Sequence, residues 1–190
     1  MVTESRWRLE TQAGCQLVIA GYPPFSYDAR GGGGLSSALP DPDASSNTLP
    51  LEFPAQDLMI PPMDSSRARF LGLPLPPGLS IRIQPDRLAG ELKPHTGELT
   101  LEFRARFRFT LGSADHPLYQ ASDLLVNTQL TSGEVRSRRH TRVGQPLNPD
   151  GLATLVGTAT IEPCRDAWLN RFLGLPDEAL AVMHLRLQRI

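Results

Sequence analysis

Arginine is the residue type with the clearest potential for chemistry in this sequence. Of the 19 basic residues only Lys93 is a lysine, so the other 18 are arginines. Arg104, Arg106 and Arg108 alternate along one stretch, which places them about 7 Å apart on one face of a strand. A guanidinium binds carboxylates or phosphates through two parallel hydrogen bonds. This face is therefore a candidate docking surface for an acidic protein partner or a phosphorylated ligand.

Four further arginines are candidates for the same surface. They occupy polar positions of two other expected strands, or follow a turn at residues 131–134: Arg82, Arg186, Arg138 and Arg139. Neighbouring strands would unite these side chains into one basic patch. The alternative is an ordinary solvent-exposed face, on which each arginine is balanced by a carboxylate of a neighbouring strand.

The opposite face of the 98–109 stretch is apolar and contains three phenylalanines, Phe103, Phe107 and Phe109. These rings could line a cavity for a small apolar ligand, because a β-barrel of about eight strands can hold one. They could equally fill the core outright, since aromatic residues make up only 6% of the chain. The sequence leaves both interpretations open.

The sequence contains no recognisable catalytic or metal-binding motif. The four histidines have neither HxH nor HExxH spacing, whereas a zinc site needs three or four converging ligands, so we expect no metal or cofactor. Asp64 and Asp166 lack the Asp-Thr/Ser-Gly motif of the aspartic proteases, and no GxSxG serine motif is present. We assign no catalytic residue. An enzyme of unknown type, using Asp86, His95 and His116 in loops at strand ends, remains an alternative.

Composition is that of an ordinary globular protein with many turns. The 190 residues are 40% hydrophobic and 21% charged, with 18 prolines and 16 glycines. A formal net charge of −1 gives no overall attraction to nucleic acid. There is no run of 18 apolar residues to span a membrane, and the N-terminus lacks the apolar region of a signal peptide. Two cysteines without CxxC spacing favour reduced thiols in the cytoplasm.

Hydrophobic alternation predicts a chain built mainly of strands. Residues 98–109 alternate strictly between apolar and polar side chains, and 152–161 form a further apolar stretch. Residues 7–10 and 15–20 are expected to form an opening strand or a hairpin around Gly14, and residues 124–130 are expected to pair as a hairpin with the residues from 135 onward. The glycine-rich segment 31–50 is predicted to be a flexible loop.

One hexapeptide occurs twice. Residues 69–74 and 171–176 both have the sequence Arg-Phe-Leu-Gly-Leu-Pro, 102 positions apart, and each is followed by an alternating strand, at 79–84 and 183–188. We predict a short helix in each copy, over 65–71 and 167–173. An aspartate would cap each helix and a glycine would end it.

These patterns together predict one all-β domain over residues 1–190. It would be an antiparallel barrel or sandwich of two similar halves, about 1–88 and 89–190, with one short helix per half. The leading functional hypothesis is a non-enzymatic binding or assembly protein that uses the arginine face. The second is a carrier of a small apolar ligand in a phenylalanine-lined interior.

Overall fold

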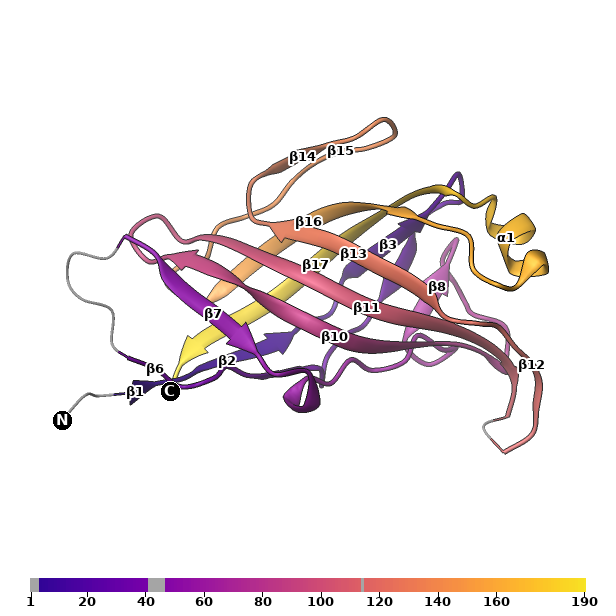
Figure 1. The fold of residues 1–190 in the computed structure, drawn as a ribbon, viewed down its shortest axis with the longest axis horizontal. Helices are drawn as coiled ribbons and strands as arrows, with labels where there is room; N and C mark the ends of the chain where they lie inside the picture. The colour runs from indigo at the N-terminus through magenta and orange to yellow at the C-terminus, as the bar shows by residue number, and fades with distance from the viewer. Residues whose placement is uncertain (1–3, 41–46, 114) are drawn as a thin grey trace.

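A large antiparallel β-sheet dominates the computed structural model, which describes residues 4–40, 47–113 and 115–190 (Figure 1). Its strands are β2 (Trp7–Thr11), β3 (Cys15–Ile19), β4 (Phe25–Tyr27), β5 (Gly33–Leu35), β7 (Leu49–Phe53), β8 (Ala68–Phe70), β9 (Leu73–Pro74), β10 (Leu79–Lys93), β11 (Glu98–Gly112), β12 (Pro117–Gln120), β13 (Leu124–Thr131), β16 (Leu152–Ile161) and β17 (Asp177–Arg189). The main strand order is β7-β10-β11-β13-β16-β17-β3-β4-β8-β9. In addition β12 pairs with β11, β2 with β17, and β5 with β2.

The remaining elements are small. Two-stranded sheets are formed by β1 (Glu4–Ser5) with β6 (Leu39–Pro40), and by β14 (Glu134–Arg136) with β15 (Thr141–Val143). A 3₁₀ turn, η1 (Ala55–Asp57), follows β7, and the helix α1 (Ala167–Leu173) precedes β17. In Figure 1, α1, β8 and β12 lie at one end of the elongated molecule, and β1 and the C-terminus lie toward the other.

The alternation of β11 is confirmed. Leu99, Leu101 and Ala105 are buried on its inner face, whereas Arg104 on the other face is exposed. Period-two alternation works here because successive side chains of a strand point to opposite faces of the sheet. The strand pairs with β10 over almost its whole length and with β13 on its other side. The predicted strand 152–161 is also present, as β16.

The core has two differently composed parts. Near the termini it is rich in leucine, with Leu51, Leu101 and Leu155 among its fully buried residues. Toward α1 it contains many alanines together with larger residues such as Ile81. Phe103 packs against both parts and so marks their junction. A core part with many small side chains fills space less completely unless the backbones approach closely.

The sheet curls but, among the described residues, does not close into a continuous ladder. Segment 59–63 partly spans the gap between β5 and β10. Met59 exchanges two backbone hydrogen bonds with Gly33, and Met63 exchanges two with Ile81. A second irregularity is the seam between β13 and β16, where the described strands share one ladder pair, Thr131 with Val156.

The first predicted helix is wrong. Residues 65–67 form a turn, and Ala68–Phe70 and Leu73–Pro74 are the paired strands β8 and β9. The second helix is confirmed as α1, with the Asp166 carboxylate accepting a hydrogen bond from the Leu169 amide at 2.9 Å and Gly174 in the left-handed conformation that ends the helix. The division into two similar halves remains a prediction; the strands after the two copies, β10 and β17, do not pair with each other.

Residues 7–20 form consecutive strands and not a hairpin, in agreement with one of the two expected arrangements, whereas the hairpin predicted after residue 124 is wrong. Strands β2 and β3 both pair with β17, one after the other, because Gly14 allows the chain to bend between them. The arginine-rich stretch after residue 133 does not return along β13. It forms its own hairpin, β14–β15, which projects from the main sheet (Figure 1).

Part of the predicted flexible loop 31–50 is ordered. Gly33–Leu35 is strand β5, Leu39–Pro40 is β6, and β7 begins at Leu49. Gly33 has a φ of 130°, and a Cβ atom there would overlap the Leu9 carbonyl, so only glycine fits this approach of β5 to β2. Residues 41–46 lie outside the described part of the chain. No helix among the described residues is long and apolar enough to cross a membrane.

Candidate functional site

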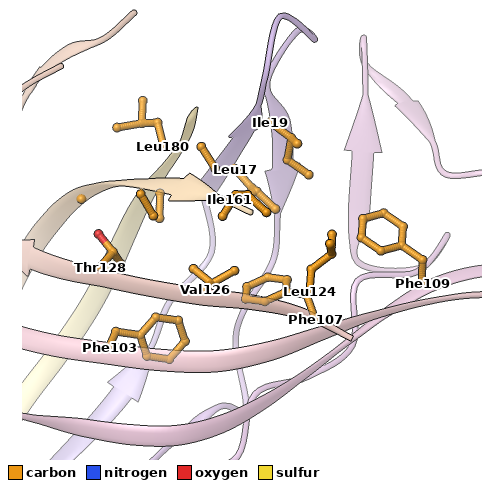
Figure 2. Close-up of a pocket in the computed structure, with 14 residues that line it drawn as sticks. Leu17, Ile19, Phe103, Phe107, Phe109, Leu124, Val126, Thr128, Ile161 and Leu180 are labelled. Carbon is orange, nitrogen blue, oxygen red and sulfur yellow. The ribbon is translucent and has the colours of Figure 1, made fainter. Parts of the chain in front are cut away.

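Two adjoining cavities lie inside the curled sheet, at the junction of the two core parts. Their volumes are about 60 Å³ and about 120 Å³. Leu17, Phe103, Phe107 and Ala181 contribute to the walls of both. Phe109 lines the first cavity only, so the structure brings all three predicted ligand-lining phenylalanines to this interior. Figure 2 shows Phe103 and Phe107, both on β11, across the space from Leu17 and Ile19 on β3.

Small residues on β16 and β17 create the hollow. Gly157 lies opposite Ala181 in the ladder, and Ala159 lies opposite Ala179. All four line the first cavity. These two pairs are neighbours on the same face of the sheet, and neither has a large side chain. They leave space that the phenylalanines of β11 do not fill. We did not predict these positions; small residues at every second position of an otherwise apolar strand are the signal that could have identified them.

The three hydroxyl groups in the cavity walls are already hydrogen-bonded within the protein. The Thr128 hydroxyl donates to the Thr158 carbonyl at 2.8 Å, the Thr11 hydroxyl to the Ala29 carbonyl at 2.5 Å, and the Tyr27 hydroxyl to the Pro61 carbonyl. A buried polar group that has its partner offers little to a ligand. The interior would therefore select a ligand by shape and apolar contact.

The ionisable groups in these walls are neutral at physiological pH. Burial raises the pKa of the Cys15 thiol, and its sulfur is hydrogen-bonded to the Gln12 carbonyl at 3.3 Å. Burial also raises the pKa of Tyr27. Because a neutral thiol is a poor nucleophile, Cys15 is a packing residue in this site.

The first cavity reaches the seam between β13 and β16. Leu124 and Val126 on β13, and Ala159 and Ile161 on β16, line this cavity from the two sides of the seam. The hydrogen bond from Thr128 to Thr158 crosses the seam. It lies between these lining residues and the Thr131–Val156 ladder pair. The wall of the cavity therefore has fewer backbone hydrogen bonds here than along β10–β11 or β16–β17.

The arginine candidates on β10 and β11 lie together on the outer face of the sheet. Arg82 stands opposite Arg108 in the ladder. The β11 arginines are paired with carboxylates: Arg104 with Glu102 at 2.8 Å, Arg106 with Asp86 at 2.8 Å and Arg108 with Asp123 at 2.7 Å. Exposed pairs of this kind contribute little to stability, but they do balance the charge of the face.

The other arginine candidates lie apart from that face. Arg138 and Arg139, in the turn of the β14–β15 hairpin, both reach Asp177 at the start of β17, at 3.4 and 2.8 Å. The pKa of Asp177 is lowered by the hydrogen bond from the Glu178 amide and by Arg139. Arg186 lies on β17, and its Nε is buried without a hydrogen-bond partner among the described residues. The seven candidates do not form one patch.

The polar residues considered for an enzyme do not converge. Asp86 pairs with Arg106 on the outer face. His95 lies in the turn between β10 and β11, whereas His116 follows the far end of β11, 15 residues of strand away. Within residues 4–40, 47–113 and 115–190, no three His, Cys, Asp or Glu side chains are grouped so as to hold a metal ion.

No protein-family model, curated protein or solved structure matches this chain. Its function must therefore be inferred from the geometry of the sheet and its interior.

Proposed function

We propose that this protein binds a small apolar molecule inside the curled sheet. The observation that carries the proposal is the pair of adjoining cavities with apolar walls, to which Phe103 and Phe107 both contribute. Apolar cavities that stay free of water gain free energy when an apolar ligand fills them, because the lining atoms acquire contact partners. Strands β3, β10, β11, β13, β16 and β17, together with segment 59–63, would enclose the ligand as a barrel does.

The volumes set the class of ligand. An apolar cavity of about 150 Å³ in another protein accommodates benzene, whereas drug-sized ligands need roughly 300 Å³ or more. The two cavities therefore suit a compact hydrocarbon group or a short alkyl chain. The hydrogen bonds already made by the wall hydroxyls disfavour a ligand with a polar group at its buried end.

Two measurements test this proposal. Native mass spectrometry of freshly purified protein should show a mass above that of the sequence, and added benzene should bind and raise the melting temperature. Replacing Ala159→Leu should weaken benzene binding at least tenfold by filling the first cavity. Ala181→Val is a milder second variant in case the first fails to fold, and Leu125→Ala, on the exposed side of β13, is the control. Protein without a co-purified ligand that also fails to bind benzene would overturn the proposal.

A second candidate function is docking of an acidic partner on the outer face of β10 and β11. It is favoured by Arg82, which is exposed and has no carboxylate partner among the described residues. A glutamate-rich peptide should then bind with an affinity that falls as salt rises. The double variant Arg104→Glu with Arg106→Glu should abolish this binding. Wild-type protein that binds no such peptide at low salt would contradict the idea.

A further inference from the structure

A row of aromatic side chains covers the end of the molecule that carries α1. Tyr119 on β12 contacts Trp168 edge-on at 5.4 Å between ring centroids, and Trp168 stacks on Phe172 at 5.1 Å. Phe172 in turn contacts Tyr22, in the turn between β3 and β4, at 5.8 Å. Three elements distant in sequence thus share one aromatic surface, at the end of the molecule shown with α1 in Figure 1.

The large apolar side chains of this surface are exposed to solvent and are not needed to fill the core. Trp168 is 59% exposed and Phe172 is 50% exposed, although both belong to a helix that buries Leu169 and Leu173. Leu71 and Leu73, each 69% exposed, lie in the β8–β9 hairpin, and Leu118 on β12 is 84% exposed. The hairpin belongs to the same end, because Phe70 pairs with Phe25 just after the Tyr22 turn.

Three arginines are interspersed with these apolar residues. Arg69, Arg165 and Arg171 are exposed, and none of them forms an ion pair with another described residue. The β11 arginines, by contrast, each have a carboxylate partner. The exposed carboxylates of Asp115, just before β12, and Glu162, between β16 and α1, offset part of this positive charge.

We propose that this end docks on the surface of a phospholipid bilayer that contains anionic lipids. Its apolar residues project from a helix, a hairpin and a strand, an arrangement that suits a deformable lipid surface. Tryptophan and tyrosine favour the bilayer interface because one part of the ring system is apolar and another is polar. Unpaired guanidiniums beside them complement the lipid phosphates through paired hydrogen bonds.

The docking surface is independent of the interior site. None of Trp168, Phe172, Leu71, Leu73 and Leu118 lines either cavity. Ligand binding and bilayer binding can therefore fail separately, and native mass spectrometry and vesicle binding report on them separately.

The chain provides its own reporter, because it has two tryptophans and the other is Trp7 near the opposite end. In a Trp7→Phe protein, Trp168 emission should shift to the blue on adding vesicles of phosphatidylcholine and phosphatidylserine. Brominated acyl chains should quench that emission. Each of Arg165→Gln and Arg171→Gln should weaken binding about fivefold, the effect of one basic residue near an anionic surface.

A matched pair of variants tests the location of the surface. Leu71→Ser should weaken vesicle binding, whereas Leu125→Ser on β13, where the leucine is 68% exposed, should not. Equal losses in the two variants, or no blue shift in the Trp7→Phe protein, would overturn the proposal. A concentration-dependent blue shift without lipid, accompanied by a dimer in size-exclusion chromatography, would assign this surface to a second copy of the chain instead.

Discussion

One hexapeptide adopts two structures in this molecule. At 69–74 it forms the hairpin β8–β9, with Leu71 and Gly72 at φ values of 52° and 78° in the turn. At 171–176 the first three of the same residues form the end of helix α1, which stops at Leu173, and the left-handed residue is Gly174 alone, at 67°. The residues preceding the hexapeptide and the surroundings of each copy must therefore decide between strand and helix.

The preceding residues differ in what they can bury. Trp168 and Leu169 lie in the first turn of α1, and Leu169 is fully buried against the alanine-rich core. The corresponding residues of the first copy are Ser66 and Arg67. Arg67 instead donates to the Asp28 and Arg30 carbonyls, at 3.2 and 2.7 Å. A short helix gains most of its stability from an apolar face packed on the rest of the protein, and the first copy has no such face to offer.

The largest expected difference between the copies concerns the leucine before the glycine. Leu173 is 3% exposed and Leu71 is 69% exposed. Leu173→Ala should therefore lower the free energy of unfolding by about 2–5 kcal/mol, through lost burial and a residual cavity. Leu71→Ala should change it by less than about 0.5 kcal/mol. Urea unfolding measures both, and similar losses would show that the copies share more of their environment than the structure indicates.

The next effect should be the same in both copies. Gly72 and Gly174 both have positive φ, and a Cβ atom would meet no neighbour within 4 Å at either position. Alanine at either site should then cost about 1–2 kcal/mol from backbone conformation alone. Thermal unfolding of Gly72→Ala and Gly174→Ala should show comparable drops in melting temperature. A drop confined to Gly174→Ala would mean that the hairpin turn can relax.

A smaller effect of opposite sign is expected in the first copy. Leu71 holds a left-handed conformation that is costly for a residue with a Cβ atom. Leu71→Gly should relieve that cost and stabilise the protein by up to about 1 kcal/mol, although glycine also loses more backbone entropy on folding. Leu173→Gly, measured beside it, should be strongly destabilising. Stabilisation in neither copy would indicate that the turn at Leu71 is not strained.

The smallest expected effect depends on pH. The pKa of Asp166 is lowered by the Tyr119 hydroxyl and the Leu169 amide, and that of Asp64 by the Ser66 hydroxyl and amide. A lowered folded-state pKa stabilises the protein above the unfolded-state pKa of about 4, and this contribution is lost as pH falls through the folded-state value. Asp166→Asn and Asp64→Asn should each reduce the acid sensitivity of the melting temperature. Unchanged acid sensitivity in Asp166→Asn would contradict the capping role of the charge.

The sequence predicted correctly those strands and helices whose own residues determine their structure. Strand β11, strand β16 and the capped helix α1 follow from alternation, an apolar stretch and an Asp–Gly pair of boundary residues. The choice between helix and hairpin at 65–71 depends on pairing with β4, which is distant in sequence. The pairing of β2 and β3 with β17 is likewise long-range.

Only one wall of the candidate site, the one formed by β11, could be predicted from the sequence. Phe103, Phe107 and Phe109 could be placed on the inner face because β11 alternates strictly. The opposite wall depends on which glycine and alanine residues of β16 and β17 become cross-strand neighbours, and no local pattern specifies that register. The ion pairs of the arginine face likewise depend on which carboxylates the sheet places beside it.

The seam between β13 and β16 gives the sheet a preferred line of opening. With one ladder pair among the described residues, the amides along the β16-facing edge of β13 have few carbonyl partners. Local opening is easiest where backbone hydrogen bonds are fewest. Amide hydrogens on that edge should exchange with solvent faster than those between β10 and β11. We therefore expect the sheet to open locally along this seam, without global unfolding, before it opens elsewhere.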